Sequence, residues 1–326
     1  MNTTFDIPFS GRAHSYTESE IEVVVNVMRH AKSLTQGTHL REFEHKFSEY
    51  AGAVHAFAVS SATSALEVAA QLCRLKEGDE VIVPAHTFTS SAYPFLKTGA
   101  RIIWADIDLE TRVVTPSTLE PHISSRTKVV VVPHLYGYGA DISGIKELTD
   151  SHGLLVVEDA AQAFGAKFNH KYAGNLGDIS SFSFNPMKVL QGYGEAGAVL
   201  TNSNKIYLEL RRKRHLGMDI VNIEKCTSLE LNSKIDELHS SLLLESLKEL
   251  KKEIKIRKNI IKNYISGLKD FTIYNKYNLH NSSGYDYQIL ISNRDKLKKY
   301  LQNKNIETKI KHPILMPNQP IFKKIK

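Results

Sequence analysis

The chain has 326 residues, of which 42% are hydrophobic and 24% charged, and its formal net charge is +7. No apolar run comes near the roughly 20 residues that a membrane-spanning helix needs, and the composition is that of a globular protein. Residues 1–15 lack the basic and apolar regions of a signal peptide, so we expect a cytoplasmic protein with no membrane contact. The two cysteines lie far apart and outside any CxxC pattern, which predicts neither a disulfide framework nor a zinc site.

The first part of the chain has the pattern of an α/β protein. A helix is expected over residues 17–33, where Thr17 opens a capping-box sequence, and a second helix over 40–50, ending near Gly52. Six short, apolar, β-branched runs then alternate with helical stretches and are expected to be strands: 80–84, 101–107, 128–135, 154–160, 179–185 and 198–202. Residues 129–132 are apolar on both faces, which indicates a mostly parallel sheet between helices.

The character of the chain changes after residue 204. Residues 1–204 hold 16 Lys and Arg against 22 Asp and Glu, a net charge of −6, whereas residues 205–326 hold 26 against 13, a net charge of +13. We therefore expect a large α/β domain over 1–204 and a small α+β domain over 205–326. The second part is predicted to contain a helix over 248–264, a strand over 287–291 and a helix near 295–301. Its lysines interleave with apolar residues at helical spacing, so we interpret them as a solvated helix face and expect no nucleic-acid partner.

Polar side chains follow several of the expected strands, at the edge of a parallel sheet where ligands bind. Asp159 closes one strand, Gln162 lies three residues further on, and Lys188 follows another strand. Residues 60–64 begin a helix whose free N–H groups are suited to a phosphate. Each signal alone is weak, because such residues are commonly caps, turn residues or solvated lysines. Together they fit pyridoxal phosphate, which needs a lysine amine, a carboxylate, an aromatic face and phosphate donors.

One stretch of sequence is highly specific: EDAAQ is followed by GD, FSF and the lysine, with glycines after it. From about residue 37 to residue 264, with LREFEHKFSEYAG, EGDEVIVPAHTFTSSA, WADID, VVPHLYGYGADISGI and GYGEAGAVLTN, the chain resembles the DegT/DnrJ/EryC1/StrS sugar aminotransferases. The resemblance implies the type I fold of pyridoxal-phosphate-dependent transferases, with the cofactor in the large domain. It also implies transfer of an amino group from an amino acid, which the family suggests is glutamate, to a nucleotide-linked keto sugar. Such a reaction serves amino-sugar biosynthesis for a polysaccharide, glycan or antibiotic.

The resemblance implies a role for each matching position. Lys188 is expected to hold the cofactor as a Schiff base and to shuttle the proton, and Asp159 to pair with the pyridine nitrogen. The other cofactor contacts are expected from Gln162 beside the phenolic oxygen, Phe88 on the ring face, and Ala62, Thr63 and Ser183 at the phosphate. Asn232 is expected to reach the phosphate of a neighbouring subunit, which implies a homodimer with shared active sites. His134 and Glu195 lie in family segments, and functional and structural roles are equally open for them; no metal site is expected.

The sequence departs from the family in two places. Lys234 stands where an arginine is usual and His239 where a glutamine is common, so the contact between subunits is less certain. The chain also ends at Lys326, earlier than family members typically do, so the small domain is expected to be truncated.

Two alternatives stay open. One is a non-catalytic, cofactor-binding regulatory or degenerate protein, which the short C-terminus makes conceivable. The other is a pyridoxal-phosphate-dependent sugar dehydratase, against which Lys188 counts, because that branch of the family has histidine in its place.

Overall fold

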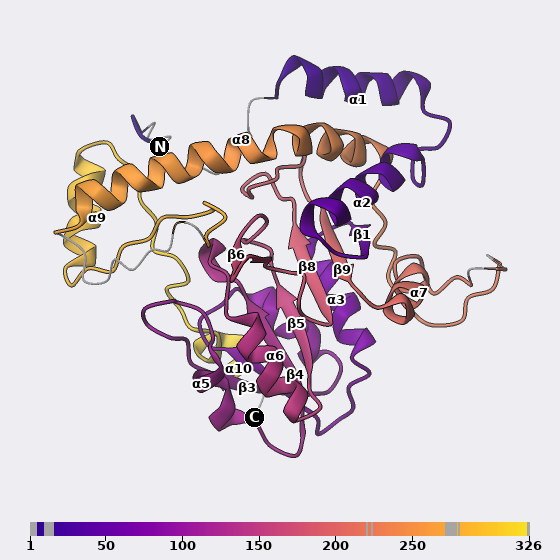
Figure 1. Cartoon of the computed structure of the whole chain (residues 1–326), viewed down its shortest axis with the longest axis horizontal. Coiled ribbons are helices and arrows are strands. Elements are labelled where there is room, and N and C mark those ends of the chain that lie inside the picture. The colour runs from indigo at the N-terminus through magenta and orange to yellow at the C-terminus, as the bar shows by residue number, and fades with distance from the viewer. Residues whose placement is uncertain are drawn as a thin grey trace.

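A computed structural model gives the structure of the chain and describes residues 5–9, 16–219, 221–222, 224–270, 279 and 281–324. A seven-stranded sheet with the order β1-β9-β8-β5-β4-β2-β3 runs through its centre (Figure 1). These strands are β1 (His55–Val59), β2 (Glu80–Pro84), β3 (Arg101–Ala105), β4 (Thr127–Pro133), β5 (Leu155–Asp159), β8 (Ile179–Ser183) and β9 (Gly197–Thr201). The strands from β8 to β3 are parallel, and β9 is antiparallel to both of its neighbours. The mostly parallel α/β sheet expected from the sequence is confirmed.

Helices cover both faces of this sheet. The α-helices are α1 (Glu18–His30), α2 (Thr38–Ala51), α3 (Ala62–Leu72), α4 (Tyr93–Leu96), α5 (Pro116–Leu119), α6 (Ile142–Ser151), α7 (Asn204–Lys213), α8 (Glu237–Leu268), α9 (Arg294–Asn303) and α10 (Pro320–Lys323). Short 3-10 helices span Thr89–Ser91, Glu120–His122, Leu135–Gly137 and Met316–Asn318, and a two-stranded hairpin joins β6 (Lys167–Phe168) to β7 (Lys171–Tyr172). Within the described ranges, no helix has the length and apolar surface that crossing a membrane requires.

Alternate side chains of each strand point to opposite faces of the sheet, so the hydrophobic core is divided between these two faces. In β4, Val129 and Val131 are buried with α3, whereas Val130 and Val132 are buried with α6. On the α6 face, α2 and α8 cover the other end of the sheet and pack phenylalanines of α2 against Phe182 and Phe184. Because successive side chains of a strand point to opposite faces, a run of valines is fully buried only when helices lie on both sides.

The first two helices begin and end close to where the sequence predicts. The Thr17 hydroxyl accepts a hydrogen bond from the Glu20 amide at 3.3 Å, and the Glu20 carboxylate accepts one from the Thr17 amide at 2.8 Å, which is the expected capping box. Gly52 ends α2 with a left-handed φ of 71°, a conformation that glycine adopts without strain. The sequence analysis missed strand β1, because its alternating HAFAV sequence is short and rich in alanine.

The strand expected over residues 287–291 is wrong. This segment contains only one bridge residue, Leu290, and no named strand. The Gln288 carbonyl oxygen accepts a hydrogen bond from Nη1 of Arg112 at 3.2 Å, so this backbone group is paired with a side chain. Past residue 204, the described residues form helices and isolated bridges. The domain boundary at residue 204 stays a prediction.

Glu237, the first residue of α8, joins that helix to α2. Its carboxylate is buried, with 2% of the side chain exposed, and accepts hydrogen bonds from the amides of Gly37, His39 and Leu40 at 2.8, 3.1 and 3.1 Å. These amides belong to the first turn of α2, where Gly37 has no side chain to serve as a cap. A carboxylate at the positive end of a helix forms charge-assisted hydrogen bonds, so Glu237 supplies the missing cap.

We expect Glu237→Ala to lower the free energy of unfolding by about 2–4 kcal/mol, because three amides at the start of α2, one of them buried, lose their acceptor. Urea unfolding followed by circular dichroism measures the change. The matched control is Glu249→Gln, which removes an exposed pair with Lys252 and should cost less than about 0.5 kcal/mol. Equal losses in the two variants would show that the buried carboxylate does not hold α2.

Candidate active site

The carboxyl ends of the parallel strands meet at one edge of the sheet. Asp159 ends β5 and Ser183 ends β8. Asp159 lies opposite Ser181 in the register of these strands, so Ser183, two residues further on, faces the same side as Asp159. This is the face that α3 covers, because Val157 and Ile179 of the same strands are buried with α3. The polar residues predicted from the sequence therefore converge beside the start of α3.

The Asp159 carboxylate is buried but keeps unused hydrogen-bonding capacity. Oδ2 accepts a hydrogen bond from the Ser91 hydroxyl at 2.7 Å, and Oδ1 accepts one from the Ala161 amide at 3.1 Å. The residue is 8% exposed. A carboxylate has about four acceptor positions, so two neutral donors leave it able to take a further, charged donor.

Lys188 lies in the loop between β8 and β9, and Asn185 organises that loop. The Asn185 carbonyl accepts a hydrogen bond from the Lys188 amide at 2.8 Å, and its Oδ1 accepts one from the Met187 amide at 3.0 Å. Its Nδ2 donates to Oε1 of Glu195 at 2.7 Å. Glu195 thus has a visible structural role, which is to brace the loop that carries the lysine.

The Lys188 amine lies over an aromatic ring in a largely buried place. Its Nζ is 5.1 Å from the centre of the Tyr285 ring. Burial lowers the pKa of Lys188, and the Asp159 carboxylate partly opposes that shift. A lysine with a lowered pKa beside a buried carboxylate is typical of sites where an amine reacts as a nucleophile or a base.

The start of α3 offers free amides beside these groups. Ser61 caps the helix by accepting a hydrogen bond from the Ser64 amide at 3.0 Å, and Ala62 and Thr63 are the first two helical residues. Amides at these positions have no partner within a helix, so they suit an anion. The chain comes very close here at Gly197, since an added Cβ would lie 2.6 Å from the Ala62 amide nitrogen. Only glycine fits at the start of β9.

The side chains of Gln162 and Phe88 contact other groups than those around Asp159. Oε1 of Gln162 accepts a hydrogen bond from the Tyr136 amide at 2.6 Å. Phe88 is 57% exposed. Its ring and that of His312 are arranged edge to face, with 6.3 Å between the ring centres. His312 has a buried Nε2 with no partner, and burial above all lowers the pKa of His312 to about 4. Its imidazole is therefore neutral at physiological pH.

His134 is structural. Its Nδ1 accepts a hydrogen bond from the Ala140 amide at 3.0 Å, so the proton of the neutral ring is on Nε2, which donates to Glu158 at 2.7 Å. Both side chains are fully buried. The Glu158 carboxylate also accepts hydrogen bonds from the amides of Gly174, at 2.6 Å, Leu176, at 2.9 Å, and Gly177. With its ring nitrogens occupied on both sides, His134 holds the strand ends in place.

Asn232 is exposed and lies in the segment 215–232, where it forms an isolated bridge with His215. The carbonyl oxygen of the next residue, Ser233, accepts a hydrogen bond from the Ser60 amide at 2.9 Å, which places Asn232 near the start of α3 of the same chain. Nζ of Lys234 lies 2.9 Å from Nε2 of His215. In the described part of the chain, no hydrogen bond joins the Asn232 side chain to Lys188 or Asp159.

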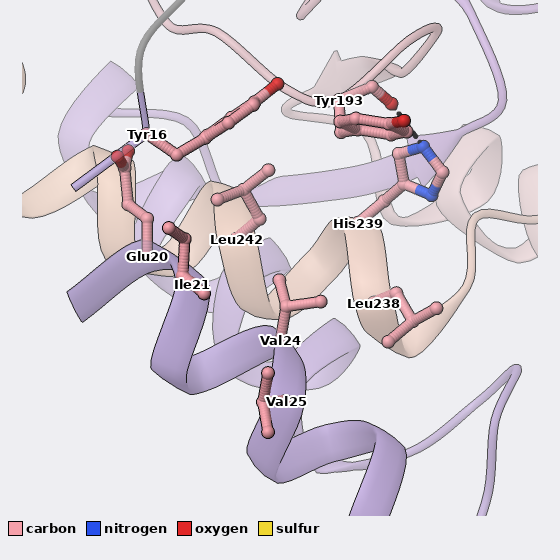
Figure 2. Close-up of a pocket in the computed structure, with 9 residues that line it drawn as sticks. All are labelled: Tyr16, Glu20, Ile21, Val24, Val25, Tyr193, Leu238, His239 and Leu242. Atoms are coloured by element: carbon pink, nitrogen blue, oxygen red, sulfur yellow. Dashed lines mark hydrogen bonds between the residues drawn. The ribbon is translucent and has the colours of Figure 1, made fainter. Parts of the chain in front are cut away.

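An apolar groove of about 370 Å³ lies between α1 and the first turns of α8 and shares no lining residue with the Lys188 site. Figure 2 shows Ile21, Val24 and Val25 of α1 facing Leu238 and Leu242 of α8. At one end, Nε2 of His239 lies 2.5 Å from the Tyr193 carbonyl oxygen. The other ring nitrogen lies 2.9 Å from the Asp236 carboxylate, so His239 can donate on both sides when it is charged.

The structure adds residues that the sequence analysis did not identify. They are Ser91 at the Asp159 carboxylate, Tyr285 at the Lys188 amine, and a polar group around His312: His86, Tyr136, Asp286 and Lys311. Two come from the segment 281–286, which the Ser283 amide pins to the Gly137 carbonyl oxygen at 2.9 Å. Ser91, His86 and Tyr136 lie within the quoted family segments but were not singled out there, whereas no motif marks Tyr285, Asp286, Lys311 or His312. Among the described residues, no three His, Cys, Asp or Glu side chains are grouped to hold a metal ion.

Comparisons with known proteins identify the family of the chain. The profile of the DegT/DnrJ/EryC1/StrS aminotransferase family matches residues 14–326. The UDP-2-acetamido-2-deoxy-3-oxo-D-glucuronate aminotransferase of Pseudomonas aeruginosa is 30% identical over 299 residues, which cover 91% of this chain and 82% of that protein. A pleiotropic regulatory protein of Geobacillus stearothermophilus is 29% identical, over 97% of this chain and 87% of its own. The crystal structure of NtdA from Bacillus subtilis, with bound cofactor PMP, superposes with a TM-score of 0.86 at 26% identity and covers 99% of this chain and 78% of that chain.

We expect His239→Gln to lower stability at pH 6 but not at pH 9. The pKa of His239 is raised, chiefly by its hydrogen bond to Asp236. The charged pair therefore stabilises the fold below the unfolded pKa of about 6.5, and this contribution is lost as the pH rises through the folded pKa. At pH 6 the loss should be about 1 kcal/mol or less, because the pair is partly exposed.

Urea unfolding of the variant and of the wild type at the two pH values measures this difference. The control is His30→Gln, since His30 is exposed and contacts the neutral Asn26 side chain. A His239→Gln loss that is equal at both pH values would show that the ionic pair contributes nothing.

Proposed function

The chain belongs to the DegT/DnrJ/EryC1/StrS aminotransferase family, and we propose that it transfers an amino group from glutamate to a keto sugar carried on a nucleotide. It is a pyridoxal-phosphate-dependent sugar aminotransferase with the type I fold. The observation that carries the proposal is the placement of the Lys188 amine, with a lowered pKa, beside the buried Asp159 carboxylate and the free amides of α3.

The residues present suit the cofactor. Asp159 is a buried carboxylate with acceptor capacity to spare, which suits the protonated nitrogen of a pyridine ring. The amides of Ala62 and Thr63 at the start of α3 suit a dianionic phosphate, and the Ser183 hydroxyl faces the same side of the sheet. We propose these residues as cofactor contacts, together with Gln162 beside the ring and Phe88 on its face.

Pyridoxal phosphate supplies an aldehyde that amines attack and a ring that takes up electron density when a proton leaves the neighbouring carbon. We propose that Lys188 Nζ would hold the cofactor at that aldehyde and, once an amino acid has taken its place, would carry a proton between the two carbons that exchange it. The Asp159 carboxylate keeps the proton on the ring nitrogen, because its negative charge favours the protonated form. Asn185 and Glu195 fix the loop, so that Nζ returns to the same place each turnover.

The substrates are proposed from chemistry and from the relatives. The Pseudomonas aeruginosa relative is named for a nucleotide-linked oxo sugar, which supports a keto sugar as the amino acceptor. The basic C-terminal part of the chain, net +13 over residues 205–326, is compatible with a nucleotide diphosphate. Glutamate as the donor follows from the resemblance to the family. The cytoplasmic location expected from the sequence stays a prediction.

A regulatory function is the second candidate, because one relative is named a pleiotropic regulatory protein. Lys188, Asp159 and Gln162 are all in place, which favours the enzyme, since a sensor needs no proton shuttle. The sugar dehydratase alternative is disfavoured by Lys188 itself.

We expect the purified chain with pyridoxal phosphate to show the visible band of a lysine-linked cofactor, and glutamate to bleach it. Lys188→Ala should show neither the covalent band nor the bleaching, because the variant lacks the amine whose charge interacts with Asp159. The control Lys251→Ala, on the exposed face of α8, should behave as the wild type. Absorbance spectra give the first result, and product analysis with UDP-, dTDP- and GDP-linked keto sugars then identifies the acceptor. A band that no amino donor bleaches would favour the regulatory function.

We also propose a homodimer in which Asn232 reaches the cofactor phosphate of the neighbouring subunit. Its exposure, beside the start of α3, supports this role, as does the exposed Tyr193 side chain at the groove of Figure 2. Sedimentation should give twice the chain mass of 36.7 kDa. Asn232→Ala should weaken cofactor affinity by about tenfold, the loss of one charge-assisted hydrogen bond, without dissociating the dimer. Asn263→Ala, on α8, is the control. A monomer would reject the dimer, and an unchanged affinity would reject the role of Asn232.

A further inference from the structure

A second lysine reaches the Lys188 site from the C-terminal segment. Nζ of Lys311 lies 3.1 Å from Oδ2 of Asp286, and the two side chains are 22% and 13% exposed. The same Nζ is 5.5 Å from the centre of the Tyr285 ring, which also lies 5.1 Å from Nζ of Lys188. Two consecutive residues, Tyr285 and Asp286, thus hold Lys311 beside the reactive amine.

The position of Lys311 is fixed by the backbone on both sides. The Met316 amide donates to the Ala85 carbonyl oxygen at 2.8 Å and pins the C-terminal segment beside the end of β2. On the other side, the Ser283 hydroxyl donates to the Gln162 carbonyl oxygen at 2.9 Å, which ties Tyr285 and Asp286 to the loop after β5. The ammonium group is therefore built into the site and does not come from a freely moving surface chain.

Charged groups face Lys188 from every element around it. They are Asp159 at the end of β5, Glu195 in the loop before β9, and Asp286 and Lys311 from the C-terminal segments. Burial lowers the pKa of Lys188 most, and among these charges only Lys311 lowers it further, with an effect larger than the opposing one of Asp286. His312 adds no charge at neutral pH, because its pKa is lowered to about 4.

We propose that Lys311 is a positioning residue of the active site: Asp286 holds its ammonium group over Tyr285, where it disfavours the charged form of Lys188 and keeps that amine reactive. A lysine next to another cationic group is a known way to obtain a neutral amine, because two like charges in a poorly solvated place repel. This inference rests on the proposed role of Lys188 as the reactive amine. The proposal gives a reason for the largely buried pair of Lys311 and Asp286 at this site, since neither side chain forms a covalent bond in the proposed reaction.

The test measures the protonation of Lys188 in the cofactor-free, full-length protein. Trace acetic anhydride acetylates only neutral amines, and mass spectrometry of the Lys188 peptide at a series of pH values gives the midpoint of the reaction. In Lys311→Met the midpoint should rise by about half a unit to one unit, as expected for loss of one charge several ångströms away. Lys311→Arg keeps the charge and should restore the midpoint to that of the wild type.

Two further variants make the result specific. Lys309→Met removes a neighbouring exposed lysine, whose Nζ lies over Phe9 at 4.6 Å, and should leave the midpoint unchanged. Lys311→Gln removes the same charge but keeps a polar side chain, so the midpoint should rise as in Lys311→Met; this variant serves if Lys311→Met does not fold. An unchanged midpoint in the folded Lys311→Met or Lys311→Gln protein would overturn the inference.

This measurement separates the inference from the proposed function. The cofactor band of the wild type reports on Lys188 as the attachment site, whereas acetylation reports on its protonation without any cofactor. A normal band with an unmoved midpoint in Lys311→Met rejects only the role of Lys311. A shifted midpoint in a protein that never forms the band rejects the proposed function and leaves the electrostatic effect established.

Discussion

The geometry of the site depends on the hydrogen bonds of the buried Glu158 carboxylate. It is fully buried, and it accepts hydrogen bonds from His134 and from backbone amides of residues 174–177. Burial alone raises the pKa of Glu158, but the His134 and amide hydrogen bonds outweigh it and the pKa is lowered, so the group stays ionised. Because neighbouring residues of a strand face opposite sides, fixing Glu158 on one face sets Asp159 on the other. The strand end therefore has one structural carboxylate and one that faces the ligand.

The sequence predicted the sheet well, because buried parallel strands are continuous apolar runs and glycine or proline marks their ends. The site residues near those ends were also placed, since strand ends of a parallel sheet meet at one edge. Strand β1 was missed because HAFAV is too short and small to stand out. The strand expected at 287–291 is not formed in the described residues, and the Gln288 carbonyl there pairs with the guanidinium of a distant residue, Arg112. Contacts of that kind depend on tertiary structure and leave no local pattern.

The same limit explains why Tyr285, Asp286 and Lys311 could not be predicted. They lie in segments without a motif, and only the backbone contacts of Ser283 and Met316 bring them to the sheet edge. The difference in net charge between residues 1–204 and 205–326 has to be interpreted with this in mind. Lysines such as Lys251 and Lys255 are exposed on α8, as expected for a solvated helix, but Lys311 is enclosed with Asp286. A count of charges therefore describes the surface of this protein and says little about its site.

The two cysteines differ in a way that is useful for experiments. Burial, above all, raises the pKa of Cys73 to about 12, whereas Cys226 is exposed, at the isolated bridge with Met218. Thiolates are the reactive form, so a maleimide dye at neutral pH attaches selectively at Cys226. That position precedes Asn232 in the chain. The sequence thus contains its own labelling site, which needs no engineered cysteine.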